Sequence, residues 1–189
     1  MPKNRIRTPY TQEAFEKHVD PTFKALISQN IASSGSEENP YDLFNQLLKD
    51  QHGLRLYKNG KTNIPNNKAY SLHIESERRI RHANKLWRNM QSANPDLKKK
   101  FEHESHHIVA SRIPAAELSR KILFAANIGI NDARNGLNVH KLKHQKLHSS
   151  GTQYYNIVNF RMAEVSGEGE QAVGAELVDI GQDIEDSVI

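Results

Sequence analysis

Apolar side chains recur at helical spacing through most of the chain, and polar loops separate these stretches. In residues 41–51, for example, Leu43, Phe44 and Leu47 fall on one face of a helix. Pro21 predicts a kink or a break in the first stretch, because proline lacks a backbone donor and clashes with the preceding turn. The stretches predicted to be helical are residues 9–29, 41–51, 75–91, 114–126, 141–148 and 154–163.

Strand patterns are fewer and shorter. Residues 54–64 alternate apolar and polar side chains around an Asn-Gly pair, which is typical of a small hairpin. Residues 106–110 predict another short strand, and Asn135-Gly136 predicts a hairpin turn that leads into a returning strand through Val139. Helices mixed with short antiparallel strands in this order predict an α+β fold.

Charge divides the chain unevenly. The net charge of +4 hides a segment, residues 163–189, that holds eight acidic residues and no lysine or arginine. Residues 1–162 therefore carry 14 of the 22 acidic and all 26 basic residues, a net charge of +12. Such a basic body favours a polyanionic partner such as nucleic acid, although a well-solvated surface explains the charge equally well. We expect three regions: a mainly helical region with a small hairpin (1–99), a core (100–163) and a short acidic C-terminal tail (164–189).

Composition narrows the classes of protein further. The chain has no cysteine, so any metal ion must be held by imidazole, carboxylate, amide or water. No window of about eighteen apolar residues is present, and we expect no membrane-spanning helix. No apolar segment follows the basic N-terminal residues, so we also expect no signal peptide.

Histidines are concentrated in one part of the chain. Six of the ten lie between His103 and His148, which argues against a plain interaction protein with scattered histidines. His140, His144 and His148 follow one another at a spacing of four residues, so they share one helix face. Two such imidazoles can share a metal ion, and His106 can complete a three-nitrogen site with an open position for water or phosphate. We expect His140, which is nearest the strand, to lie outside this site.

The His106-His107 pair can divide two tasks. Neighbouring side chains on a strand point to opposite faces, so one histidine can bind a metal while the other accepts a proton. An isolated pair of this kind is more often two ordinary surface histidines. Asn135-Gly136 is likewise explained by a tight turn alone, but the Asn135 amide can also pin backbone and so fix the histidine strand.

The order of these motifs resembles one family. The segments that carry the resemblance are His106-His107-Ile108-Val109-Ala110, then residues 122–137 with Asn135-Gly136, then His144-Gln145-Lys146-Leu147-His148, and then Tyr154-Tyr155. They resemble the AHH nucleases of the HNH/endonuclease VII superfamily, which have a ββα-metal (His-Me finger) core and often occur as toxin domains. The resemblance covers about residues 100–162, and Ser105 stands where the family name implies alanine.

The resemblance implies roles for individual residues. His106, His144 and His148 would be metal ligands, His107 the general base and Asn135 a positioning residue. One divalent ion is implied; imidazole ligands suit Zn²⁺ or Ni²⁺, and Mg²⁺ or Mn²⁺ can act through a looser site. The implied function is a metal-dependent endonuclease, with DNA favoured over RNA, that acts as a bacterial toxin or effector. Such a protein would be made in the producer's cytoplasm, delivered by a secretion system and bound by a cognate immunity protein.

Basic side chains near these motifs are candidates for phosphate contacts. They are Lys141, Lys143 and Lys146 beside the histidine helix, and Arg78, Arg81 and Lys85 in the basic helix. For the second group, a solvated helix face is an equally good explanation. The alternative function is a nucleic-acid-binding module with a degenerate nuclease site, which would hold no stoichiometric metal.

Overall fold

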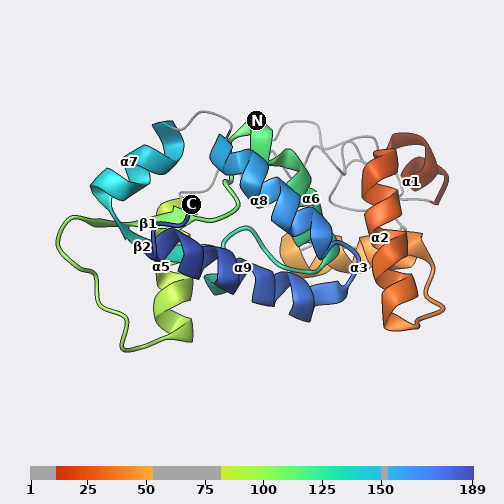
Figure 1. The fold of residues 1–189 in the computed structure, drawn as a ribbon. Helices are drawn as coiled ribbons and strands as arrows, with labels where there is room; N and C mark the ends of the chain where they lie inside the picture. The colour runs from red at the N-terminus through yellow and green to blue at the C-terminus, as the bar shows by residue number, and fades with distance from the viewer. Residues whose placement is uncertain (1–11, 53–81, 150–152) are drawn as a thin grey trace, which may run out of the picture.

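The fold is a row of helices with a small sheet near one end (Figure 1). The computed structural model describes residues 12–52, 82–149 and 153–189. The hairpin predicted for residues 54–64 and the first part of the helix predicted for residues 75–91 lie outside the described residues. The described elements are α1 (Gln12–His18), α2 (Pro21–Ser34), α3 (Pro40–His52), α5 (His82–Ala93), β1 (His103–His107), the 3-10 turn η2 (Pro114–Ala116), α6 (Glu117–Ala125), the 3-10 turn η3 (Ala133–Asn135), β2 (Gly136–His140), α7 (Lys141–Ser149), α8 (Gln153–Glu164) and α9 (Gly169–Glu185).

The first predicted helix is two helices, so the break expected at Pro21 is confirmed. Asp20 caps α2 by accepting a hydrogen bond from the Phe23 backbone N–H at 3.2 Å, and Pro21 occupies the first turn, where no donor is needed. Gly35 ends α2 with a left-handed φ of 65°. The Phe23 ring lies 4.9 Å from that of Phe124 in α6. Through this contact the N-terminal helices share the core of the rest of the chain.

β1 and β2 form an antiparallel pair, and His107 lies opposite Gly136. Helices combined with this small sheet give the α+β class that was predicted. The tight hairpin turn predicted at Asn135-Gly136 is wrong. Residues 108–135, which include α6, connect the two strands, and Gly136 has an extended φ of −121° instead of the positive φ that a tight Asn-Gly turn requires.

Gly136 has a packing role instead. A Cβ atom at this position would lie 2.6 Å from the Met90 Sδ atom and 2.8 Å from the Leu86 Cδ1 atom, both on α5. The absent side chain therefore allows α5 to pack directly on β2, next to the strand that carries the histidine pair.

We expect Gly136→Ala to lower the free energy of unfolding by about 1–3 kcal/mol, because the added methyl group overpacks the contact with α5. Urea denaturation measures this change. Gly129→Ala is a matched control, since a Cβ there would meet nothing within 4 Å. The control should change stability by less than about 0.5 kcal/mol. Equal unfolding midpoints for the two variants would contradict the close packing of α5 on β2.

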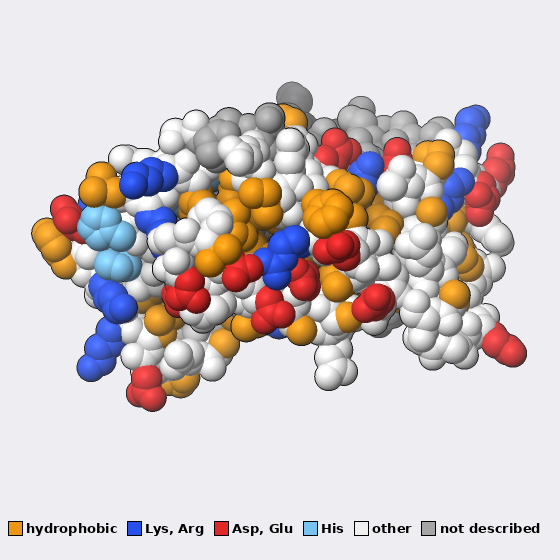
Figure 2. Space-filling view, in the orientation of Figure 1, with side chains coloured by type: hydrophobic (Ala, Val, Ile, Leu, Met, Phe, Trp, Pro, Cys, Tyr) orange, Lys and Arg blue, Asp and Glu red, His pale blue; other side chains and the backbone are white. Residues whose placement is uncertain are grey.

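The acidic C-terminal segment differs from the expected tail, because most of it is a core helix. Four apolar side chains of α9 are fully buried: Val173, Leu177, Ile180 and Ile184. Its acidic side chains pair with cations of the body: Arg161 Nε lies 2.5 Å from Glu176 Oε1, and Arg134 Nη2 lies 2.9 Å from Glu170 Oε1. Figure 2 shows acidic side chains gathered over α9, which Figure 1 labels in the same orientation. None of the described helices combines the length and apolarity that spanning a bilayer requires.

Candidate metal and catalytic centre

Three histidines from two elements converge at one point. His106 comes from β1, and His144 and His148 come from successive turns of α7. One ring nitrogen of each lies within 4.8 Å of those of the other two. The Nε2 atoms of His144 and His148 are 3.0 Å apart, close to the roughly 3.3 Å between two nitrogen ligands of a tetrahedral zinc ion. The structure thus brings together the three histidines predicted as ligands, hereafter the histidine trio.

The hydrogen bonds of His106, a member of the trio, leave one of its ring nitrogens without a partner. His106 is 1% exposed, and its Nε2 atom lies 2.9 Å from the Tyr154 hydroxyl oxygen. That hydroxyl donates its hydrogen to the Ile108 carbonyl at 2.9 Å, so it accepts from His106 Nε2–H. The Nδ1 atom is buried without a hydrogen-bond partner. A buried lone pair of this kind fits a metal ligand and would otherwise be unfavourable.

The other two members of the trio are oriented in the same way. The Nδ1–H of His144 donates to Glu104 Oε2 at 3.0 Å, which leaves the Nε2 lone pair for a metal. The Nδ1 atom of His148 lies 2.6 Å from the Tyr155 hydroxyl. Each member therefore has a second partner that fixes its ring, and such partners orient the ligands of metal sites in general. The residues of this chain fit a bound divalent ion.

His107 belongs to a different network. Its Nε2 atom lies 3.1 Å from the Asn131 side-chain oxygen, and His82 Nδ1 lies 3.2 Å from the same oxygen. An amide oxygen only accepts, so both rings donate to it, and the Nδ1 atom of His107 keeps its lone pair. Asn131 is itself held, because Asn89 donates to its backbone carbonyl at 2.6 Å. His107 is thereby placed beside the trio with one nitrogen ready to accept a proton.

Burial governs the charge of both adjacent histidines. It lowers the pKa of His107 to about 4, and His82 and His144 add to this effect while the hydrogen bond to Asn131 opposes it. Burial also lowers the pKa of His106 well below its ordinary value, with further contributions from His144, His148 and His107. Both rings are therefore neutral near neutral pH, the form required of a metal ligand and of a base.

The side-chain hydrogen bonds of Asn135 go to backbone near the trio and not to the trio itself. Its side chain is fully buried, its oxygen accepts from the Val109 N–H at 2.7 Å, and its amide donates to the carbonyls of Val109 and Ile130 at 3.2 and 2.8 Å. Val109 is two residues beyond His107. The amide therefore pins backbone beside the histidine strand, although no hairpin turn is involved.

A cleft of about 370 Å³ opens onto the trio and His107. Arg112, Ser105 and Ser111 also line it. Burial lowers the pKa of His82, and the charge of Arg112 lowers it further. Arg112 and His82 both line the cleft, so the guanidinium contributes positive charge there. A larger cavity of about 610 Å³ lies between α7, α8 and the C-terminal residues, and it contains no member of the trio.

The cations predicted to contact nucleic acid differ in their surroundings. The Lys143 ammonium donates to the carbonyls of Ile184 and Glu185, so it caps the C-terminus of α9. Three others are exposed: Lys85, Lys141 and Lys146. Arg78 and Arg81 lie outside the described residues.

Several residues of this centre were not predicted from the sequence. Glu104 had a detectable signal, because a residue two positions before His106 lies on the same face of a strand. Tyr154 and Tyr155 entered only as part of a family resemblance, and nothing in the sequence distinguished Asn131. His140, expected outside the site, is the last residue of β2, directly before α7, and it accepts a hydrogen bond from the Leu142 N–H at 3.3 Å.

The comparison with known families agrees with this geometry. The sequence model of the AHH family, described as a nuclease family of the HNH/ENDO VII superfamily with conserved AHH, matches residues 86–184. Comparison with curated proteins and with solved structures gives no match. The protein is therefore a nuclease, a hydrolase that acts on nucleic acid. Since the match covers more than half of the chain, it belongs to the AHH family, as the sequence motifs predicted, with Ser105 in place of the motif's alanine.

We expect Tyr154→Phe to weaken metal binding about 10- to 100-fold, the usual effect of removing a second partner of a ligand. The change leaves the His106 Nε2–H and the Ile108 carbonyl without the hydroxyl that joins them. Competition with a zinc-binding dye measures the affinity. Tyr41→Phe removes a hydroxyl on α3 and is the control. An unchanged zinc affinity in Tyr154→Phe would show that Tyr154 does not orient His106.

Proposed function

We propose that the protein is a metal-dependent endonuclease whose ββα-metal core consists of β1, β2 and α7, within residues 100–163. One observation carries the proposal: adjacent histidines on β1 enter separate networks. His106 lies in the trio with His144 and His148 and keeps one buried ring nitrogen without a hydrogen-bond partner, whereas His107 is held by Asn131 outside the trio. This arrangement separates a metal ligand from a general base, as hydrolysis of a phosphodiester requires.

In the proposed reaction, His107 accepts a proton through Nδ1 from the water that attacks phosphorus. The bond between phosphorus and the 3′ oxygen then breaks. Burial keeps His107 in the neutral form that a base requires, while the lowered pKa also weakens its affinity for the proton, and Asn131 fixes its ring. A divalent ion held by the trio would supply positive charge that stabilises the charge developing on the phosphate and the leaving oxygen. Arg112 is placed to contact the same phosphate from the cleft wall.

The donor set guides the choice of metal. Three imidazole nitrogens favour Zn²⁺ or Ni²⁺, while Mg²⁺ and Mn²⁺ prefer oxygen ligands and would be bound more weakly. All three predicted ligands have an orienting partner, and this completeness supports an active centre over a degenerate binding module.

DNA is the favoured substrate, and RNA is the alternative. The exposed lysines Lys85, Lys141 and Lys146 support binding of a nucleic-acid backbone, as do Arg78 and Arg81 by their sequence. Lys143 is left out of this set because its ammonium caps α9. The role as a bacterial toxin or effector, delivered by a secretion system and matched by an immunity protein, rests on the family resemblance of the motifs.

Cleavage of supercoiled plasmid tests the proposal. EDTA should abolish nicking, and adding Zn²⁺, Ni²⁺, Mn²⁺ or Mg²⁺ back should restore it with at least one of these ions. Metal content should be one ion per chain in the wild type and should fall in His148→Ala. Nicking that persists in EDTA would refute metal dependence. Absence of cleavage of both plasmid and RNA with every ion would refute the proposed activity.

A further inference from the structure

We propose that Phe101, the lysines before it, and Lys141 with Leu142 form a nucleic-acid contact in which Phe101 stacks on an unpaired base. We call this set the Phe101 surface: Lys98, Lys99, Lys100, Phe101, Lys141 and Leu142. The inference rests on the proposed nuclease function and adds the kind of strand that the protein binds.

Exposure is the first observation. Phe101 is 89% exposed and Leu142 is 62% exposed, although both are large apolar side chains. The three lysines before Phe101 are also exposed, and no ion pair within the described part of the chain involves them. Exposed apolar side chains beside cations mark a surface that binds a partner, and the one carboxylate adjoining Phe101 in the sequence, Glu102, lies 3.5 Å from His140 Nε2.

The Phe101 backbone belongs to a fixed turn. The His103 ring donates from Nδ1 to the Phe101 carbonyl at 2.8 Å, and the Lys141 N–H donates to the Glu102 carbonyl at 2.8 Å. Glu102 adopts a left-handed φ of 57°, which is uncommon for a residue other than glycine. The second bond also ties the turn to the start of α7, where Leu142 lies. Phe101 is therefore held at the surface by its neighbours.

The chemistry of the Phe101 surface fits single-stranded nucleic acid. Lysines follow the phosphate backbone, and an aromatic ring stacks on bases of any identity. In a duplex the bases already stack on one another, so Phe101 would find no open base face there. A flexible acidic protein would satisfy the lysines but would give the ring no stacking partner.

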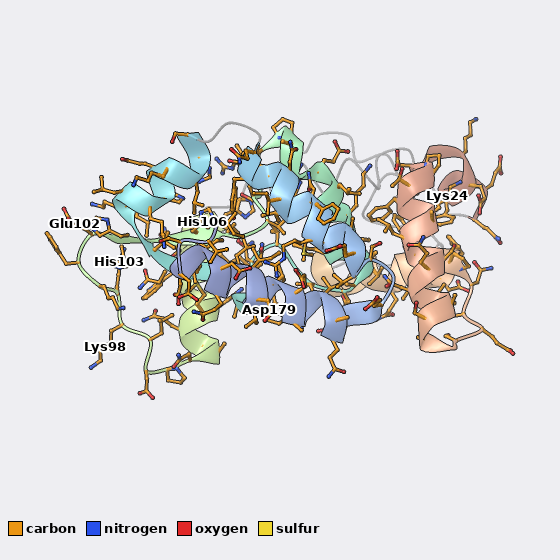
Figure 3. The ribbon with its side chains drawn as sticks, viewed as in Figure 1. Lys24, Lys98, Glu102, His103, His106 and Asp179 are labelled. Atoms are coloured by element: carbon orange, nitrogen blue, oxygen red, sulfur yellow. The ribbon has the colours of Figure 1, made fainter. Side chains whose placement is uncertain are left out.

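The position of this surface connects it to the catalytic centre. Figure 3 shows Lys98, Glu102 and His103 at the end of the molecule, with His106 further in. β1 begins at His103, two residues after Phe101, and the three strand steps from His103 to His106 span about 10 Å. That distance corresponds to about three stacked nucleotides at about 3.4 Å each. One strand can therefore lie on the Phe101 surface and in the cleft at the same time.

Fluorescence anisotropy in EDTA, which prevents cleavage, tests the inference with a labelled DNA strand of about 12 nucleotides and with its duplex. Phe101→Ala should weaken single-strand binding about tenfold, the effect of removing one stacking residue, and duplex binding by less than about twofold. Phe101→Trp should retain or strengthen it. Replacing Lys99 and Lys100 with alanine should flatten the dependence of log affinity on log salt by about 0.7 for each phosphate that is no longer neutralised.

Phe160→Ala is the matched control, because Phe160 on α8 is also exposed, at 66%, but the cation next to it, Arg161, is paired with Glu176 and Asp183. Unchanged single-strand affinity in Phe101→Ala, an equal loss of affinity for the duplex, or an equal loss in Phe160→Ala would each overturn the inference. Turnover of bis(p-nitrophenyl) phosphate, which is too small to reach Phe101, separates the two proposals. It should be unaffected in Phe101→Ala, and its absence in the wild type would count against the nuclease mechanism alone.

Discussion

Replacing His107 with alanine should lower the rate of plasmid cleavage by about 10²–10⁴-fold, the usual contribution of a general base. Metal binding should be retained, because the trio does not include His107 and the second partners of the trio are Tyr154, Glu104 and Tyr155. Single-turnover cleavage at saturating metal measures the rate, and metal content per chain measures the site. A large loss of rate with one ion still bound would assign His107 to proton transfer.

His140→Asn provides the control for His107→Ala. His140 also lies next to α7, but its Nδ1 atom accepts from the Leu142 N–H, and asparagine can make the same cap. This variant should therefore keep both metal and activity. Two results would contradict the assignment of the base: cleavage by His107→Ala within about tenfold of the wild-type rate, or loss of metal from that variant.

The predictable part of this centre depends on local periodicity. Two histidines four residues apart share a helix face wherever the helix packs, and the side chains of adjacent strand residues point to opposite faces of the sheet. For this reason His144 and His148 could be placed together, and His106 and His107 apart, before any fold was known. The α+β class, the break at Pro21 and the helix at residues 141–148 followed from equally local signals.

The remaining features depend on contacts between distant segments. A side chain at position 136 would collide with Met90, and no sequence pattern near Gly136 reveals that distant neighbour. An Asn-Gly pair is so common in tight turns that the local interpretation prevailed, although α6 lies between the two strands. Asn131 cannot be identified from the sequence for a similar reason. Its role comes from the hydrogen bonds that its side-chain oxygen accepts from His82 and His107, both of which are distant in the sequence. In the C-terminal segment, acidity suggested a tail, but the apolar positions at helical spacing were the better guide to burial.

Asn135 offers the second large effect, on stability more than on chemistry. Asn135→Asp keeps the acceptor for the Val109 N–H but removes the amide that donates to the carbonyls of Val109 and Ile130. It also places a carboxylate against two carbonyl oxygens at a fully buried position. Each buried group left unpaired disfavours the fold by about 1–3 kcal/mol, so we expect a loss of about 3 kcal/mol or more. This is a large part of the roughly 5–15 kcal/mol that stabilises a typical domain.

Urea denaturation in EDTA measures the Asn135 effect without the stabilisation that a bound metal would add. Asn156→Ala, on the exposed side of α8, is the control and should change stability by less than about 0.5 kcal/mol. Cleavage by Asn135→Asp should also fall under conditions where it is fully folded, because Val109 is two residues from His107 and moves when its backbone bonds are broken. Asn135→Asp with wild-type stability and wild-type cleavage would show that this amide neither holds the strand nor positions the base. Full activity with reduced stability would limit its role to folding.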